Sequence, residues 1–214
     1  MDETKLQQFS REYLSGELRE EDALEDPYLQ FLKWLDDAVN AGVPDPTAMA
    51  LATAGKQGKP SVRIVLLKEA RENGLVFFSN YESRKGKELL QNPKASVVFF
   101  WPGLERQLRI EGTISKLPDS ESDEYYNSRP LKSRIATLIS RQSSVISGRD
   151  ELQVDFNDAK LLLDIARISR PPYWGGYFLK PDSYEFWQGR EHRLNDRLEY
   201  YQDGGSWKIR RLAP

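Results

Sequence analysis

The chain of 214 residues has no cysteine and a single histidine, His192. The absence of cysteine excludes disulfides, thiolate nucleophiles, zinc–thiolate sites and cysteine-ligated iron–sulfur clusters. A single imidazole excludes a multi-histidine metal site, so we expect no metal ion. With no second imidazole or thiol to work with, we expect His192 to be structural. Any chemistry in this protein must proceed without sulfur and nearly without imidazole.

Long apolar segments are absent as well. The longest run, Ala95–Trp101, is far too short to span a bilayer, and residues 1–5 lack the basic flank and apolar stretch of a signal peptide. We therefore expect a cytoplasmic protein that contacts no membrane. There are 31 Lys and Arg against 33 Asp and Glu, a net charge of −2. A general nucleic-acid binder needs an excess of cations, so we expect no nucleic-acid partner.

Short apolar segments separated by turn residues dominate what is present. No repeat or low-complexity segment divides the chain, and its length suits one domain, residues 1–214. The pattern predicts strands over residues 48–54, 61–68, 75–80, 95–101, 106–116, 174–180, 183–188, 197–202 and 207–212. No helix of crossover length separates the second and third of these, which indicates an antiparallel sheet or barrel.

Helical patterns interrupt these strands. The Asp26-Pro27 pair is typical of an N-cap followed by a first-turn proline. Apolar residues follow at helical spacing: Phe31, Leu32, Leu35 and Val39. We also expect helices over residues 5–14, over 83–91 and through much of 119–166. The sequence thus predicts an α+β domain in which helices flank a β-barrel.

A cation-rich helix start is the first candidate binding site. Ser83 is a good N-cap, which places Arg84 and Lys85 in the first helical turn. Cations there oppose the helix dipole, whereas a bound anion would use both the cations and the free backbone N–H groups as a phosphate site. A solvated charge run paired with nearby glutamates is the alternative.

A second cation-rich helix start follows downstream. Pro130 suits the first helical position, with Arg129 just before it and Ser133 in the following turn. Tyr125 would share the face of Arg129 if the preceding helix runs on that far. Two such sites in a chain of net charge −2 suggest two phosphates, on one ligand or on a pair.

Two strands add further polar candidates. If residues 193–197 are extended, Arg193, Asn195 and Arg197 project to one face; an exposed polar strand with salt bridges is the alternative. The apolar segment Arg63–Lys68 reads as a core strand whose terminal cations lie on opposite faces unless it twists or bulges. Those cations are candidates for anion contacts at a cavity edge. Neutral donors that can read the edge of a heterocycle are Gln107, Gln142 and Ser143.

The order of these motifs resembles the pyridoxine/pyridoxamine 5′-phosphate oxidase family, from about Leu6 to Pro214. The matching segments are Asp45–Met49, Arg63–Lys68, Ser83–Lys85, Glu105–Gln107, Ser128–Pro130, Gln142–Ser143, Trp174–Gly176, Glu185–Gly189, Arg193–Leu194, Asp196–Arg197 and Trp207–Pro214. The resemblance implies an antiparallel split β-barrel with flanking helices. It also implies a homodimer that holds FMN at the subunit interface.

The resemblance also implies roles for individual residues. Those that would hold FMN are Arg63, Ile64, Val65, Leu66, Leu67, Lys68, Phe78, Ser79, Arg84, Lys85, Gln107, Gln142, Ser143, Trp187 and Arg197. Those that would bind the substrate are Ser10, Arg11, Tyr13, Lys68, Tyr125, Arg129, Ser133, Arg193, Leu194 and Asn195. Arg193 and Asn195 would be the catalytic pair over the pyridine ring. Residues 1–25 would form a mobile substrate lid.

The chain departs from the family pattern at two positions. Asn195 stands where the family usually has histidine, so this position cannot titrate near neutral pH. In the lid, Ser10 stands where the family usually has arginine three residues before a tyrosine, here Tyr13.

The implied reaction is the FMN-dependent oxidation of pyridoxine or pyridoxamine 5′-phosphate by O₂ to pyridoxal 5′-phosphate, with release of hydrogen peroxide. The cofactor carries the electron chemistry, which suits a protein with so few reactive side chains. The alternatives are a non-catalytic split-barrel protein that binds FMN or pyridoxal phosphate, or a flavin reductase of the same fold. Tyr125, Arg129 and Ser133 discriminate among these, because a generic flavin binder needs no second phosphate clamp.

Overall fold

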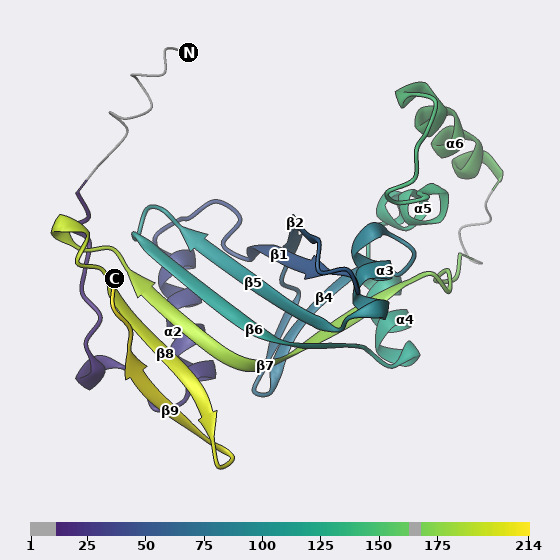
Figure 1. Cartoon of the computed structure of the whole chain (residues 1–214). Coiled ribbons are helices and arrows are strands. Elements are labelled where there is room, and N and C mark those ends of the chain that lie inside the picture. The colour runs from purple at the N-terminus through teal and green to yellow at the C-terminus, as the bar shows by residue number, and fades with distance from the viewer. Residues whose placement is uncertain (1–11, 163–167) are drawn as a thin grey trace. The chain divides into compact units, whose positions relative to one another are not determined.

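The computed structural model of the protein describes residues 12–162 and 168–214. Its strands follow the hydrogen-bonded order β2-β1-β5-β6-β7-β4-β3, with β8 paired to β7 and β9 to β8 (Figure 1). The pairs β3–β4, β4–β7, β7–β8 and β8–β9 are antiparallel. The prediction of an antiparallel α+β protein is therefore confirmed.

The elements have the following bounds. The strands are β1 Ala48–Ala54, β2 Pro60–Leu66, β3 Glu69–Arg71, β4 Gly74–Asn80, β5 Lys94–Trp101, β6 Arg106–Lys116, β7 Trp174–Gln188, β8 Asp196–Asp203 and β9 Ser206–Arg211. The helices are α2 Pro27–Asn40, α3 Arg84–Gln91, α4 Asp119–Ser128, α5 Leu131–Ile139 and α6 Arg149–Leu162, with short 3₁₀ turns at Glu20–Asp22 and Glu191–Arg193. The helix predicted over residues 5–14 falls mostly outside the described residues. Within them, Glu12–Leu14 are not helical.

The chain divides into two compact units. Unit 1 contains the described residues up to Ala50 together with Val97–Glu111 and Pro181–Pro214, and unit 2 contains Leu51–Ser96 and Gly112–Lys180. Whether residues 1–214 act as one domain stays a prediction.

Helix α2 supplies much of the core of unit 1. The carboxylate of Asp26 accepts a hydrogen bond from the Tyr28 backbone N–H at 2.8 Å, which confirms the predicted cap. Trp34 packs edge-on against Phe186 with ring centroids 5.0 Å apart. Val39, the last of the apolar residues noted at helical spacing, does not belong to the buried face: its side chain is 53% exposed, and Ala38 takes the buried position instead. At 100° per residue, position 38 continues the stripe of the buried Trp34.

Helix α3 of unit 2 begins where the sequence predicts. The Ser83 hydroxyl accepts a hydrogen bond from the Gly86 backbone N–H at 3.3 Å. A Cβ at Gly86 would lie 2.1 Å from the Tyr81 carbonyl oxygen, so only glycine permits this close approach of the helix to the end of β4. The first turn of α3, with Arg84 and Lys85, is thereby fixed against the sheet.

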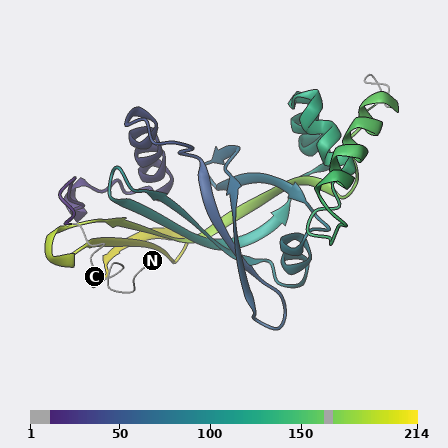
Figure 2. The same cartoon turned by 90° about the horizontal axis from the view of Figure 1, so that it is seen from above.

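Helices α4 and α5 and the start of β7 contribute to a hydrophobic cluster in unit 2. Tyr126 on α4, Ile135 on α5, Ile168 and Trp174 are buried together. Helices α5 and α6 lie side by side in both views of the chain (Figures 1 and 2). This packing fixes the junction between α4 and α5, where the second cation-rich segment lies.

The prediction that Arg63–Lys68 belongs to a core strand was wrong. Strand β2 ends the hydrogen-bonded order and pairs only with β1, and its side chains alternate between exposed and half-buried. Val62 and Ile64 are 68% and 66% exposed in the single chain. An edge strand has a neighbour on one side only, so apolar composition alone does not bury it.

Two expectations near the C-terminus were also wrong. Residues 174–188 form one strand, β7, rather than two. Its first part pairs with β4 and its second part with β8, and Pro181 lies between the two paired segments. Residues 191–193 form a turn in which His192 and Arg193 adopt positive φ angles of 55° and 60°. Strand parity therefore does not apply to Arg193 and Asn195, and the extended segment begins only at Asp196.

Candidate cofactor and substrate site

A pocket of unit 2 collects most of the residues predicted to bind FMN. It has a cavity volume of about 810 Å³ and is walled by β2, β4, the start of α3 and the segment that joins α4 to α5. The lining residues are Ser61, Val62, Arg63, Ile64, Val65, Leu66, Lys68, Phe78, Ser79, Arg84, Lys85, Tyr125, Arg129, Pro130, Ser133, Gln142, Ser143 and Trp174. Leu67, which was also predicted, does not line this pocket and is buried.

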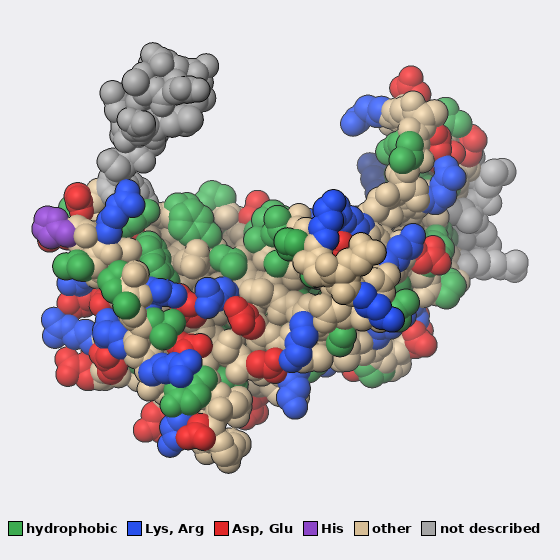
Figure 3. Space-filling view, in the orientation of Figure 1, with side chains coloured by type: hydrophobic (Ala, Val, Ile, Leu, Met, Phe, Trp, Pro, Cys, Tyr) green, Lys and Arg blue, Asp and Glu red, His purple; other side chains and the backbone are tan. Residues whose placement is uncertain are grey.

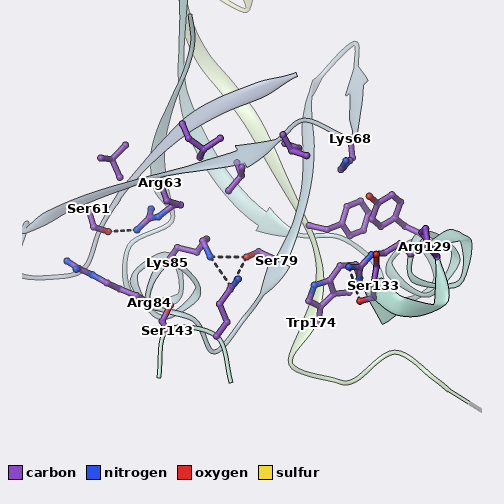
Figure 4. Close-up of a pocket in the computed structure, with 18 residues that line it drawn as sticks. Ser61, Arg63, Lys68, Ser79, Arg84, Lys85, Arg129, Ser133, Ser143 and Trp174 are labelled. Atoms are coloured by element: carbon purple, nitrogen blue, oxygen red, sulfur yellow. Dashed lines mark hydrogen bonds between the residues drawn. The ribbon is translucent and has the colours of Figure 1, made fainter. Parts of the chain in front are cut away.

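The pocket brings together the two cation-rich segments. Arg63, Arg84 and Lys85 lie on one side in Figure 4, and Arg129 and Ser133 lie on the other. The sequence places these segments about 45 residues apart, and the fold sets them around a single cavity. This arrangement suits two separate anionic groups.

Lys85 is the most buried cation of the pocket. Its side chain is 7% exposed, and its Nζ donates to Gln142 Oε1 at 3.0 Å and to Ser79 Oγ at 3.1 Å (Figure 4). It also donates to Ser83 Oγ at 3.3 Å. All three acceptors are neutral. Burial, assisted by the positive charge of Arg63, lowers the pKa of Lys85 to about 8. An anion in the pocket would favour the charged form.

The opposite side of the pocket combines a cation with aromatic rings. The guanidinium of Arg129 lies 4.6 Å from the centroid of the Trp174 ring, and its Nη1 donates to Thr137 Oγ1 at 2.8 Å. Burial lowers the pKa of Arg129, and it raises the pKa of Tyr125. Tyr125 stacks on Phe78 with centroids 3.8 Å apart. Helix α4 ends at Ser128, so Tyr125 and Arg129 do not lie on one continuous helix. Both nevertheless line the pocket.

Lys68 also lines the pocket. It follows the end of β2 at Leu66, and its backbone N–H donates to the Val76 carbonyl at 2.9 Å. The turn removes Lys68 from the alternation of the strand. Arg63 and Lys68 therefore both reach the pocket although they differ in parity.

The other predicted residues that the structure describes belong to unit 1. Trp187 and Arg197 are directly paired across β7 and β8. Arg197 Nε donates to Glu185 Oε1 at 2.9 Å, and its Nη1 donates to the Ala213 carbonyl at 2.7 Å. Gln107 lies half-buried on β6. These contacts set the position of the Arg197 guanidinium within unit 1.

The turn after β7 holds the predicted catalytic pair. Asn195 Oδ1 accepts a hydrogen bond from the Arg190 backbone N–H at 3.0 Å, while Arg193 and Leu194 are exposed. The Tyr13 ring lies edge-on to Trp187 at 5.7 Å. A Cβ at Gly189 would come within 2.6 Å of the Tyr13 ring, so glycine is required there. Ser10 and Arg11 lie outside the described residues.

Sequence reasoning missed a set of buried partners. Glu88 accepts hydrogen bonds from Ser61 and Thr53, which lie 27 and 35 residues away in the sequence. No local pattern marks such distant partners. Sequence reasoning also missed that Phe78, Tyr125 and Trp174 form one aromatic stack.

The described residues offer neither a metal site nor a membrane-spanning helix. Within residues 12–162 and 168–214, no group of His, Cys, Asp or Glu side chains is arranged to hold a metal ion. In the same part of the chain, no helix is long and apolar enough to cross a membrane. On the face seen in Figure 3, basic and acidic side chains are interspersed, in keeping with the balanced charge.

Known proteins match this chain over most of its length. Residues 35–162 match the family described as pyridoxamine 5′-phosphate oxidase, and residues 174–214 match the C-terminal dimerisation region of pyridoxine 5′-phosphate oxidase. The pyridoxine/pyridoxamine 5′-phosphate oxidase of Cupriavidus metallidurans is 49% identical, over 99% of this chain and all of that protein. The Bordetella pertussis protein of the same name is 53% identical, over 94% of this chain and 96% of its own.

Solved structures support the fold. The crystal structure of PhzG from Burkholderia lata, in complex with tetrahydrophenazine-1-carboxylic acid, superposes with a TM-score of 0.85 at 32% identity, covering 91% of this chain and 95% of PhzG. An FMN-binding protein from Nostoc punctiforme, related to pyridoxamine 5′-phosphate oxidase, gives 0.68 at 17% identity, covering 88% of this chain and 98% of its own. The split-barrel prediction is thereby confirmed. With matches over nearly its whole length, the chain belongs to the pyridoxine/pyridoxamine 5′-phosphate oxidase family.

Proposed function

We propose that this protein is an FMN-dependent oxidase that converts pyridoxine or pyridoxamine 5′-phosphate to pyridoxal 5′-phosphate. The observation that carries the proposal is the single pocket with a cation-rich group on each side. A flavin phosphate and a substrate phosphate need two such groups. Relatives that are 49% and 53% identical to this chain are named pyridoxine/pyridoxamine 5′-phosphate oxidase.

The donor set of the pocket fits FMN. Lys85 is a buried ammonium group surrounded by neutral acceptors, so a phosphate beside it supplies the missing negative charge. Arg84 stands next to it in the first turn of α3, where backbone N–H groups also favour an anion. The half-buried and exposed side chains of β2 offer an apolar surface to the flat ring system.

The opposite group suits the substrate phosphate. Arg129, Ser133 and Tyr125 combine a guanidinium and two hydroxyls, which are strong donors to phosphate oxygens. Lys68 also lines the pocket and adds a positive charge. A protein that only stores flavin has no need for this second group, which favours the oxidase over the binding protein.

Bound FMN supplies the redox chemistry, taking electrons from the substrate and passing them to O₂. The chain's own residues bind and orient the reactants. Arg197, held by Glu185 and by the Ala213 carbonyl, supplies a fixed positive charge. The guanidinium of Arg193 has hydrogen-bond donors and no acceptor, and the side chain of Asn195 cannot take up a proton. We infer that these residues position the pyridine ring and that neither acts as a general base.

We also infer a homodimer, since residues 174–214 match the dimerisation region of the family. The assignment of individual residues to FMN or substrate stays a prediction, as do the use of O₂, the cytoplasmic location and the absence of membrane contact. The lid expected over residues 1–25 stays a prediction as well.

The direct test is turnover by the purified protein. We expect it to bind FMN and, with O₂ and either phosphorylated vitamer, to form pyridoxal phosphate and hydrogen peroxide in equal amounts. Both products are measured, because a flavin reductase would form no pyridoxal phosphate. If the protein binds FMN and pyridoxal phosphate but oxidises neither vitamer, it is a binding protein and not an oxidase.

A further inference from the structure

A carboxylate on α3 lies behind the arginines of the pocket. The side chain of Glu88 is only 13% exposed. Its Oε2 accepts hydrogen bonds from Thr53 Oγ1 at 2.6 Å and from Ser61 Oγ at 2.5 Å. Burial raises the pKa of Glu88, but these hydrogen bonds and the contact with Arg84 outweigh burial and lower the pKa to about 2. The group is therefore an anion at every working pH.

Glu88 contacts both nearby arginines. Its Oε1 accepts a hydrogen bond from Arg84 Nε at 2.9 Å, and its Oε2 accepts one from Arg63 Nη2 at 3.3 Å. Thr53 is on β1, Ser61 and Arg63 are on β2, and Arg84 and Glu88 are on α3. One carboxylate thus connects three elements at the end of the pocket where the flavin phosphate is expected.

Arg63 is held largely by the protein itself. Its Nη1 donates to the Leu51 carbonyl at 3.1 Å and to Thr53 Oγ1 at 2.5 Å, while its Nη2 donates to Ser61 and Glu88. Both terminal nitrogens therefore have protein acceptors. This guanidinium adds positive charge to the pocket but has few donors left for a ligand.

Arg84 is in the opposite situation. Glu88 takes its Nε in an i,i+4 pair, whereas Nη1 and Nη2 have no partner within the described residues. The side chain is 56% exposed. A guanidinium fixed through Nε keeps its terminal N–H groups available to phosphate oxygens.

We infer that Glu88 is a positioning residue for the flavin phosphate. It fixes Arg84 through Nε so that the terminal N–H groups face the phosphate, and it holds the partly buried Arg63 in place. The inference rests on the proposed function, because it assigns the phosphate of FMN to this end of the pocket. The carboxylate costs some attraction for the phosphate, and the gain in geometry outweighs that cost.

The experiment compares FMN with riboflavin, which has the same ring system and no phosphate. The apoprotein and its variants are titrated with each flavin, and Kd is read from flavin fluorescence. We expect Glu88→Ala to raise the Kd for FMN about tenfold or more and to leave the Kd for riboflavin within about twofold. Glu88→Gln, which keeps an oxygen acceptor at this place, is expected to fall between Glu88→Ala and the wild type.

Two further variants separate positioning from charge. Glu82→Ala removes an exposed carboxylate two residues before Arg84 and is expected to leave FMN binding unchanged or slightly tighter. In an Arg84→Ala background, Glu88→Ala should raise the Kd for FMN much less than it does in the wild type, because Glu88 acts largely through Arg84.

Three results would overturn the inference. FMN binding by Glu88→Ala as tight as in the wild type shows that the carboxylate only opposes the phosphate. An equal loss of FMN and riboflavin shows a general structural role. A wild-type protein that binds FMN no better than riboflavin has no phosphate recognition at all; that failure belongs to the proposed function and is visible without any variant.

Discussion

Arg197 Nε donates to the buried carboxylate of Glu185 at 2.9 Å. Glu185 lies on β7 two residue pairs from Trp187, the residue that pairs directly with Arg197. Glu185 Oε2 also lies 2.6 Å from Arg109 Nη2. The carboxylate is 3% exposed, so it is a buried anion between two arginines. A residue predicted to contact FMN is thus held by one that sequence reasoning did not single out.

Replacing this carboxylate should destabilise the protein. Glu185→Gln removes the buried negative charge that Arg109 and Arg197 share. We expect the free energy of unfolding to fall by about 1–3 kcal/mol, since both arginines keep some access to water. Denaturant unfolding of the apoprotein measures it. The matched control is Glu111→Gln, which removes the exposed partner of Arg109 at 3.2 Å and should cost less than about 1 kcal/mol. Equal effects of the two variants would contradict the prediction.

Lys85 makes FMN binding depend on pH. Its pKa in the free protein is lowered from 10.5 to about 8, so between these values the unfolded chain binds more protons than the folded one. The stability of the apoprotein should therefore rise with pH across this window, and below pH 8 the fold carries the cost of a buried charge. A bound phosphate favours the charged amine. FMN binding should then take up a proton, and its affinity should fall as the pH rises above about 8.

Titration of the apoprotein with FMN between about pH 7 and pH 10 measures this dependence. Lys85→Arg keeps the charge throughout and should flatten the profile. Lys85→Gln should bind FMN weakly at every pH. A wild-type affinity that stays constant over the whole range would show that Lys85 does not face the phosphate.

Arg129 should serve the substrate and not the flavin. Its guanidinium lines the side of the pocket opposite Lys85, so Arg129→Ala should raise the KM for pyridoxamine phosphate while FMN stays bound. A lost charge-assisted contact of about 1.5–3 kcal/mol corresponds to roughly tenfold to more than a hundredfold. Lys132→Ala, which removes an exposed cation from the first turn of α5, three residues after Arg129, is the control and should change neither constant. Loss of flavin together with substrate would mean that the two phosphate sites are divided wrongly.

The features that sequence predicted correctly are those set by local chemistry. The caps of α2 and α3 depend on side chains two or three residues from the groups that they bind, and Asp26 and Ser83 are recognisable without any tertiary contact. The cation-rich segments were found in the same way. That they line one pocket is seen only in the structure.

The features that were missed depend on distant neighbours. Apolar composition could not reveal that Val62 and Ile64 lie on an edge strand, because burial depends on which strands pair with β2. The partners of Glu88 come from other elements. The left-handed conformation of His192 and Arg193 is rare outside glycine, so extended backbone was the natural expectation there.

Asn195 provides the last prediction. Its Oδ1 accepts the Arg190 backbone N–H at 3.0 Å, so the side chain is fixed as an acceptor on one side and a donor on the other. A neutral histidine can do the same, accepting through Nδ1 and donating through Nε2. We therefore expect Asn195→His to change kcat/KM by about tenfold or less, equivalent to roughly 1.4 kcal/mol.

The pH profile shows whether this position only orients the substrate. A protonated imidazole cannot accept a hydrogen bond from the Arg190 backbone N–H. The Asn195→His variant should therefore lose activity at acid pH, with a pKa at or below about 6.5, whereas the wild type should show no such loss. Arg193→Ala removes a positive charge that no neighbouring change restores. It should lower kcat/KM far more than any substitution at Asn195. If Asn195→His instead raises turnover by several orders of magnitude from a nearly inactive wild type, the position needs a proton carrier. The wild-type chain would then bind its ligands without oxidising them.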